Sequence, residues 1–103
     1  MPKIVKQDKS RVPFDEIKLK EGISRSLEKR PVSEEDFETL IEQIKRDIRG
    51  FGEREVSSRV IGETVMKHLR KIDEVAFIRF ASVYRRFEDI NEFSEEVEKL
   101  TND

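Results

Sequence analysis

Two stretches of this sequence combine residue types that could hold an anionic ligand. The first opens the chain, where Ile4 and Lys6 alternate in a short β-branched segment and Lys18 follows on the first turn of an expected helix. Alternate residues of a strand share one face, and lysine ammonium groups are compact partners for phosphate. The pattern would suit a base and its phosphates. On residue types alone, however, an edge strand whose lysines keep it soluble explains the segment better.

The second stretch is residues 75–87, VAFIRFASVYRRF, which holds three arginines and no acid. Arginine beside aromatic rings can recognise nucleotides or nucleic acid through stacking and phosphate contact. The helical spacing of Phe77 and Phe80 instead indicates the buried face of a helix. Tyr84 carries a polar tip, so it can end at the wall of a pocket.

Patterns typical of catalysis do not stand out. The sequence has no P-loop, no His-Glu-x-x-His and no Gly-x-Ser-x-Gly motif. It has no cysteine, which excludes disulfides and thiolate zinc sites within these 103 residues. The single histidine, His68, is interpreted as a surface or boundary residue. We therefore expect no enzyme activity and no metal site in this chain.

Charge is unevenly distributed along the chain, although the net charge is only -2. Residues 1–30 hold nine basic and five acidic residues (+4), residues 31–87 hold eleven of each (0), and residues 88–103 hold one lysine and seven acids (-6). A basic start could meet a polyanion and an acidic end could meet a basic partner, but solvated helix faces are the simpler interpretation.

Composition favours a small packed domain. Charged residues make up 43% of the chain, but the low net charge and seven phenylalanines argue against disorder. No apolar run approaches the roughly 20 residues of a membrane helix, and no signal peptide is present. A soluble, cytoplasmic protein without a membrane partner is expected.

Short strands are predicted near the start of the chain. Residues 1–8 suit one strand, residues 8–10 a polar turn, and residues 11–14 a second extended piece, so a β-hairpin is expected. Pro13 limits the second piece to an edge. Residues 53–56 are a candidate third strand.

Helices are predicted from capping residues and from apolar residues at helical spacing. The expected N-caps are Asp15, Ser33, Ser57 or Ser58, and Asp73. The expected apolar faces are Leu19, Ile23 and Leu27; Phe37, Leu40, Ile41, Ile44, Ile48 and Phe51; Ile61, Val65, Leu69 and Ile72; Phe77, Phe80, Ala81, Tyr84 and Phe87; and Ile90, Phe93, Val97 and Leu100.

Two helix ends are also predicted. The first helix should end near residues 28–30, because Pro31 disfavours helix at the residue before it. Gly50 and Gly52 should end the second helix.

Several segments resemble a known family. IVKQD…VPFDEIKL resembles the opening of an ATP-cone domain, whose usual form is a Val-x-Lys-Arg-x-Gly strand followed by Phe-Asp-x-x-Lys. EKRPVSEED, GEREVSSRVIGETVMKHL and VAFIRFASVYRRFEDINEF resemble the ATP-cone half of NrdR-type repressors, which control ribonucleotide reductase genes in bacteria. The resemblance runs from about Pro2 to Leu100.

The resemblance implies an α+β fold that is mostly helical: a β-hairpin or three-stranded sheet capping a four-helix bundle over residues 1–88, with an acidic helix and tail over residues 89–103. It also implies that ATP or dATP binds as an allosteric effector, with Mg²⁺ as a candidate companion ion. The bound nucleotide would set the homo-oligomeric form of the repressor.

Carried over position by position, the resemblance implies a nucleotide site built from seven residues: Ile4, Lys6, Gln7, Lys18, Ser58, Ile61 and Tyr84. Three positions depart from the family pattern. Gln7 stands where arginine is frequent, Lys9 where glycine is frequent, and Val12 where an acid is frequent.

NrdR-type repressors touch operator DNA through an N-terminal zinc ribbon with four cysteines, and this sequence has none. Zinc and operator DNA are therefore expected only through a ribbon that lies outside this sequence. Two alternatives stay open: the N-terminal cone of a ribonucleotide reductase large subunit, and a helical interaction domain with no small ligand. The acidic end favours the repressor over the enzyme subunit.

Overall fold

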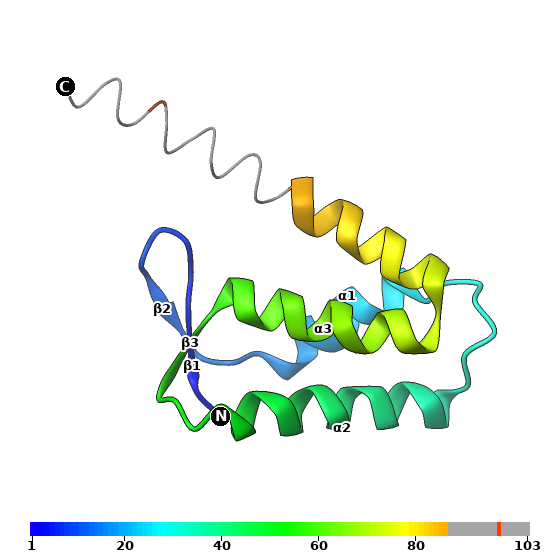
Figure 1. Ribbon diagram of the computed structural model, residues 1–103, viewed down its shortest axis with the longest axis horizontal. Coiled ribbons are helices and arrows are strands. Elements are labelled where there is room, and N and C mark those ends of the chain that lie inside the picture. The colour runs from blue at the N-terminus through cyan, green and yellow to red at the C-terminus, as the bar shows by residue number, and fades with distance from the viewer. Residues whose placement is uncertain (87–96, 98–103) are drawn as a thin grey trace.

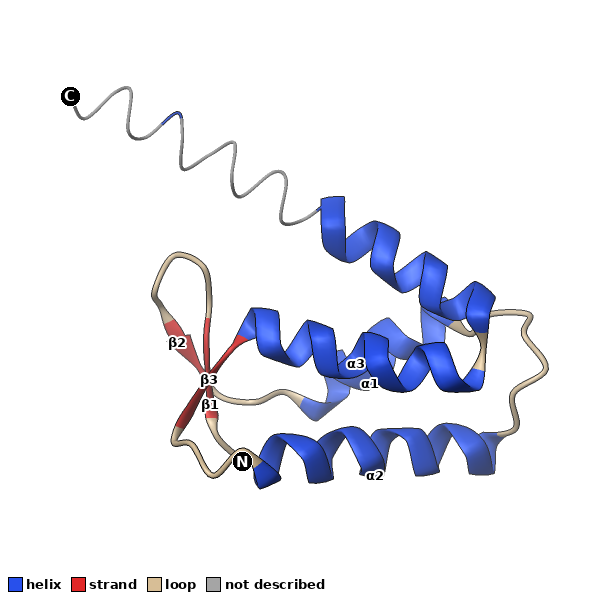
Figure 2. Ribbon diagram, viewed as in Figure 1, coloured by secondary structure: helices blue, strands red, loops and turns tan. Residues whose placement is uncertain are grey.

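The computed structural model describes residues 1–86 and Val97. Its elements are β1 (Lys3–Val5), β2 (Arg11–Val12), α1 (Glu16–Ser26), α2 (Glu34–Gly50), β3 (Glu55–Ser57), α3 (Ser58–Ile72) and a further helix over residues 74–86. The predicted α+β fold, mostly helical with a small three-stranded sheet, is confirmed (Figure 2). Apart from Val97, the predicted acidic helix and tail lie outside the described residues, as does Phe87.

The sheet has the strand order β2-β1-β3 and lies at one end of the helices, where α3 begins (Figure 1). β1 pairs antiparallel with β2, placing Ile4 opposite Val12, and parallel with β3, placing Ile4 opposite Val56. The predicted hairpin is confirmed. The third strand begins two residues later than the predicted start at residue 53 and leads directly into α3.

At one of the three positions that depart from the family pattern, the structure favours the usual glycine over the lysine found here. Lys9 has a φ of 71°, in the left-handed region where glycine is favoured. Asp8 supports this turn, since its carboxylate accepts from the backbone N–H of Ser10 at 2.9 Å and from the Ser10 hydroxyl. These hydrogen bonds lower the pKa of Asp8 below its ordinary value.

Each labelled helix begins at a side-chain cap. Asp15 accepts from the Lys18 N–H at 3.1 Å, Ser33 from the Asp36 N–H at 3.0 Å, and Ser57 from the Val60 N–H at 3.2 Å. Of the two predicted caps for α3, the structure uses Ser57. α1 ends at Ser26, earlier than predicted, because the chain turns through Lys29 at a φ of 61°.

The core joins the four helices found within residues 1–86. Its fully buried members are Ile23, Leu40, Ile41, Ile44, Ile48, Val65, Leu69 and Ala76. Phe77 and Phe80 pack against it while partly buried, and Ala76 takes the innermost position of their helix. The prediction that Phe51 belongs to the apolar face of α2 was wrong: Phe51 is 42% exposed, since α2 ends at Gly50 and the chain turns away at Gly52. None of the helices among the described residues combines the length and apolarity needed to cross a membrane.

Asp73 joins the last described helix to the loop after α1. Its carboxylate accepts from the Ala76 N–H at 2.9 Å and, through both oxygens, from the Arg30 guanidinium at 3.0 Å. The Ala76 N–H, followed by Arg30, holds the pKa of Asp73 below its ordinary value. Asp73 therefore acts as the predicted cap and as one half of an ion pair.

Asp73→Ala is expected to lower the thermal midpoint of unfolding by about 4–8 °C, because it removes both interactions. Asp73→Asn should cost less, since its amide oxygen can still cap. Because folding lowers the pKa of Asp73, its stabilisation is present above the ordinary value of 3.8 and disappears as the pH falls through the folded pKa. Melting curves between pH 3 and 7 check this. As the pH falls, the unfolding temperature of both variants should drop less than that of wild type. If the unfolding temperatures of all three proteins fell in parallel with pH, the role of the Asp73 carboxylate would be contradicted.

Candidate functional site

A cavity of about 1060 Å³ lies where the sheet meets the helices. Its walls come from β1 and the hairpin, from α1 and the segment that leads into it, from the first half of α3 and from helix 74–86. The volume lies just above the range of about 300–1,000 Å³ that small-molecule and cofactor sites usually occupy. A mononucleotide is a ligand of suitable size.

All seven residues predicted for the nucleotide site line this cavity. They are Ile4, Lys6, Gln7, Lys18, Ser58, Ile61 and Tyr84. They come from four elements that are separated by as many as 80 positions in the sequence, so only the fold brings them together. Their contact with a nucleotide stays a prediction.

The cavity divides into a charged side and an apolar side. Lys6 and Lys18 are exposed at its edge, and Lys18 belongs to the first turn of α1, where the helix dipole favours an anion. Ile4, Ile61 and Phe80 are partly buried and supply apolar wall. A nucleotide would suit both sides of the cavity, with its phosphates on the charged side and its base against the apolar side.

Three acids also line the cavity, and each carboxylate has a partner of its own. Asp8 accepts from Ser10 in the hairpin turn, and Asp15 caps α1. Glu16 pairs with Lys45 of α2 at 2.5 Å, and this hydrogen bond lowers the pKa of Glu16 and raises that of Lys45. The three acids are thus engaged in holding the walls of the cavity.

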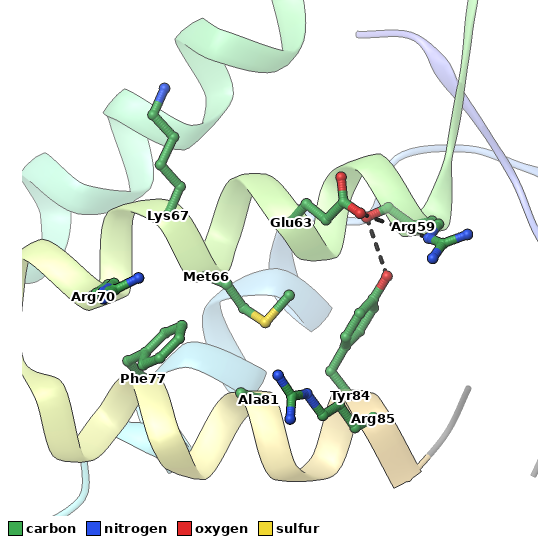
Figure 3. A pocket seen from close by; sticks show the side chains of 9 residues that line it. All are labelled: Arg59, Glu63, Met66, Lys67, Arg70, Phe77, Ala81, Tyr84 and Arg85. Carbon is green, nitrogen blue, oxygen red and sulfur yellow. Dashed lines mark hydrogen bonds and ion pairs between the residues drawn. The ribbon is translucent and has the colours of Figure 1, made fainter. Parts of the chain in front are cut away.

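Tyr84 closes the cavity from helix 74–86. Its hydroxyl donates to the carbonyl oxygen of Arg59 at 3.2 Å, as the dashed line in Figure 3 shows. Its ring packs directly on α3 at Gly62, where an added Cβ would lie 2.3 Å from the ring atom Cε2. Only glycine lets the two helices meet in this way.

Sequence reasoning missed several lining residues, of which Gly62, Phe14 and Arg59 matter most here. Gly62 carried a usable signal, because a glycine inside a helical pattern often marks a close packing contact. Phe14 and Arg59 carried none, since an aromatic before a helix and a cation in its first turn are common. Outside the cavity, His68 is a boundary residue as predicted, with its Nε2 2.7 Å from an Asp47 carboxylate oxygen.

The fold and the cavity together define a small ligand-binding domain: helices closed at one end by a short sheet, with lysines and an apolar wall facing one space. Within residues 1–86 and Val97, no group of three or more His, Cys, Asp or Glu side chains could hold a metal ion. The model of the ATP cone domain family matches residues 2–90. This chain belongs to the ATP-cone family, whose members bind ATP or dATP as allosteric effectors.

Proposed function

We propose that this chain is the nucleotide sensor of an NrdR-type repressor of ribonucleotide reductase genes. ATP or dATP in the cavity would set the homo-oligomeric form of the repressor and thereby its affinity for operator DNA. The observation that carries the proposal is that all seven positions carried over from the family line one cavity in an ATP-cone fold.

In this proposal the two sides of the cavity bind different parts of the nucleotide. Lys6 and Lys18 would meet the phosphates with charge-assisted hydrogen bonds, helped by the N-terminus of α1. Ile4, Ile61 and the Tyr84 ring would hold the base and sugar. Mg²⁺, where it accompanies the nucleotide, would be coordinated mainly by the phosphates, as is usual for this ion.

In this proposal the nucleotide is an effector and not a substrate. The carboxylates that line the cavity are engaged with Ser10, with the start of α1 and with Lys45. A general base for hydrolysis would need a carboxylate that reaches an attacking water instead. We therefore propose a regulator without enzyme activity, acting in the cytoplasm.

The repressor host is preferred over a ribonucleotide reductase subunit because EKRPVS, GEREV and RFASVYRRFEDI together resemble the repressor cones. The cavity would serve either host equally well. In the repressor, a zinc ribbon outside this sequence would contact operator DNA, and the cone would act only by changing how subunits assemble.

Calorimetry on protein stripped of carried-over nucleotide tests the binding step. ATP and dATP are each expected to bind with micromolar or tighter affinity and to compete for the cavity. Adenosine should bind more weakly, because it lacks the phosphates that the lysines would meet. Absence of heat with both nucleotides would refute the sensor proposal and leave the ligand-free interaction domain.

A further inference from the structure

The charged residues that line the nucleotide cavity cancel one another. The lining holds three cations and three acids, so their formal charges sum to zero. They are Lys6, Lys18, Arg59, Asp8, Asp15 and Glu16. A nucleoside triphosphate carries several negative charges and is attracted by a site of positive potential. Groups that offset the acids from outside the lining therefore decide how well the cavity accepts phosphate.

Glu16 differs from the other two acids in its partners. The hydrogen bonds that Asp8 and Asp15 accept come from neutral groups, a serine and a backbone N–H. The carboxylate of Glu16 instead meets two ammonium groups, one at each oxygen. Its Oε1 lies 2.5 Å from Nζ of Lys45, and its Oε2 lies 3.5 Å from Nζ of Lys20. Neither lysine lines the cavity, so both act on it from outside.

Lys45 is the stronger of the two partners. Its side chain is only 14% exposed, whereas that of Lys20 is 37% exposed and lies 3.5 Å from Glu16. Each lysine also contacts a second acid, Glu42 at 3.3 Å for Lys45 and Glu38 at 3.8 Å for Lys20, but both of these acids are largely exposed. Solvent weakens ion pairs between exposed groups. The pair of Glu16 with Lys45 is therefore expected to offset the carboxylate charge most.

We infer that Lys45 is a positioning residue for phosphate binding and that it acts through Glu16. Glu16 is the first residue of α1, and Lys18 follows two residues later in the same turn. With its charge offset by Lys45 of α2, the Glu16 carboxylate would not repel the phosphates that Lys18 meets. This inference rests on the proposed function, since it specifies how the charged side of the cavity accepts a triphosphate.

A structural tie between α1 and α2 would use the same ion pair, but it predicts a different response to Glu16→Gln. Loss of a tie would loosen the start of α1 and weaken ATP binding. Loss of a negative charge beside Lys18 would instead strengthen ATP binding, because the Lys45 ammonium then adds to the positive potential of the site. The direction of the change in affinity separates the two roles.

Calorimetry with ATP, inorganic tripolyphosphate and adenosine tests the role of Lys45. Lys45→Met is expected to weaken both phosphate ligands about tenfold, because it leaves the charge of Glu16 without its main partner, and to change adenosine binding by less than about twofold. Glu16→Gln should strengthen both phosphate ligands by about two- to fivefold. The double variant, Glu16→Gln with Lys45→Met, should return to within about twofold of wild type, because the repelling carboxylate is gone.

Lys67→Met is the matched control. It removes the same charge from another ion pair, since Lys67 lies 3.9 Å from Asp47, and Lys67 does not line the nucleotide cavity. It should change ATP affinity by less than about twofold, because exposed charges outside the site are screened. An equal loss in Lys67→Met and Lys45→Met would mean that the overall charge of the domain, and not the pair with Glu16, attracts the phosphates.

Two further results would overturn the inference: weaker ATP binding by Glu16→Gln, or a double variant that binds ATP as weakly as Lys45→Met. Either would assign the pair a structural role alone. If Lys45→Met does not fold, Glu16→Gln still decides, since the two roles change affinity in opposite directions. Wild type that binds tripolyphosphate with this pattern but neither ATP nor dATP would keep the role of Lys45 and refute the sensor. Wild type that binds none of these ligands would refute both proposals.

Discussion

Replacing Lys6 or Lys18 with alanine is expected to weaken ATP and dATP binding by about 10- to 100-fold, since a hydrogen bond to a charged group contributes about 1.5–3 kcal/mol. Adenosine binding should change by less than about threefold, because adenosine presents no phosphate to either ammonium group. Lys6 lines the cavity from the residue after β1 and Lys18 lines it from α1, so each substitution would remove one side of the proposed phosphate contact. Calorimetric titration of each variant with all three ligands measures the difference directly.

Lys3→Ala is the matched control. Lys3 belongs to the same strand as Ile4, is exposed, and is absent from the cavity lining. Its removal lowers the charge of the domain by the same amount, so it should weaken the triphosphates less than twofold. If the Lys6 or Lys18 variant lost affinity for adenosine and for ATP equally, that lysine would not act by contacting phosphate. An equal loss in the Lys3 variant would mean that overall charge, and not contact, attracts the nucleotide.

The helices were predictable because their signals are local. α2 combines Ser33 at the N-cap, three acids in the first turn and apolar residues at helical spacing, and its observed cap and buried residues follow that pattern. Each of these signals acts over a few residues, within reach of sequence reasoning. The ends were less predictable: α1 stops at Ser26 because the chain turns at Lys29, and nothing in the residue type of a lysine signals a left-handed φ.

Strand pairing was beyond local signals. The parallel pairing of β1 with β3 joins Ile4 to Val56, which lie 52 positions apart, and it depends on how α1 and α2 return the chain to the sheet. The exposure of Phe51 has a related cause. The spacing of Phe51 continues the apolar face of α2. The helix ends one residue earlier, however, so the Phe51 ring does not pack on the core.

The candidate site was predicted from family resemblance and not from residue types. Taken alone, Ile4 and Lys6 fitted an ordinary edge strand, and Tyr84 fitted either a core or a pocket position. The fold changes this, because it places the strand, the start of α1, α3 and helix 74–86 around one space. Gly62 was missed since its significance comes from a tyrosine 22 positions later that packs upon it.

Gly62→Ala is expected to weaken nucleotide binding about tenfold by displacing Tyr84 from the cavity wall. The new Cβ would lie 2.3 Å from Cε2 and 2.9 Å from Cδ2 and Cζ, so the ring must move. Overpacking of this kind typically costs 1–3 kcal/mol, whereas alanine in place of a helical glycine contributes only about 0.5–1 kcal/mol in the other direction. The free energy of unfolding should therefore fall by about 1 kcal/mol in denaturant titrations.

Gly50→Ala provides the control, since Gly50 is also helical and an added Cβ there meets nothing within 4 Å. It should leave nucleotide affinity close to wild type and raise the free energy of unfolding by about 0.5–1 kcal/mol or less, because no clash opposes the gain. Tyr84→Ala supplies the decisive comparison, because it removes the ring that the new methyl group meets. If the clash is the cause, Gly62→Ala should cost nothing further in the Tyr84→Ala background, and the double-mutant cycle should show a coupling energy of about 1 kcal/mol or more. Additive effects would mean that Gly62 acts on α3 alone, and that the contact between α3 and helix 74–86 does not hold Tyr84 at the cavity.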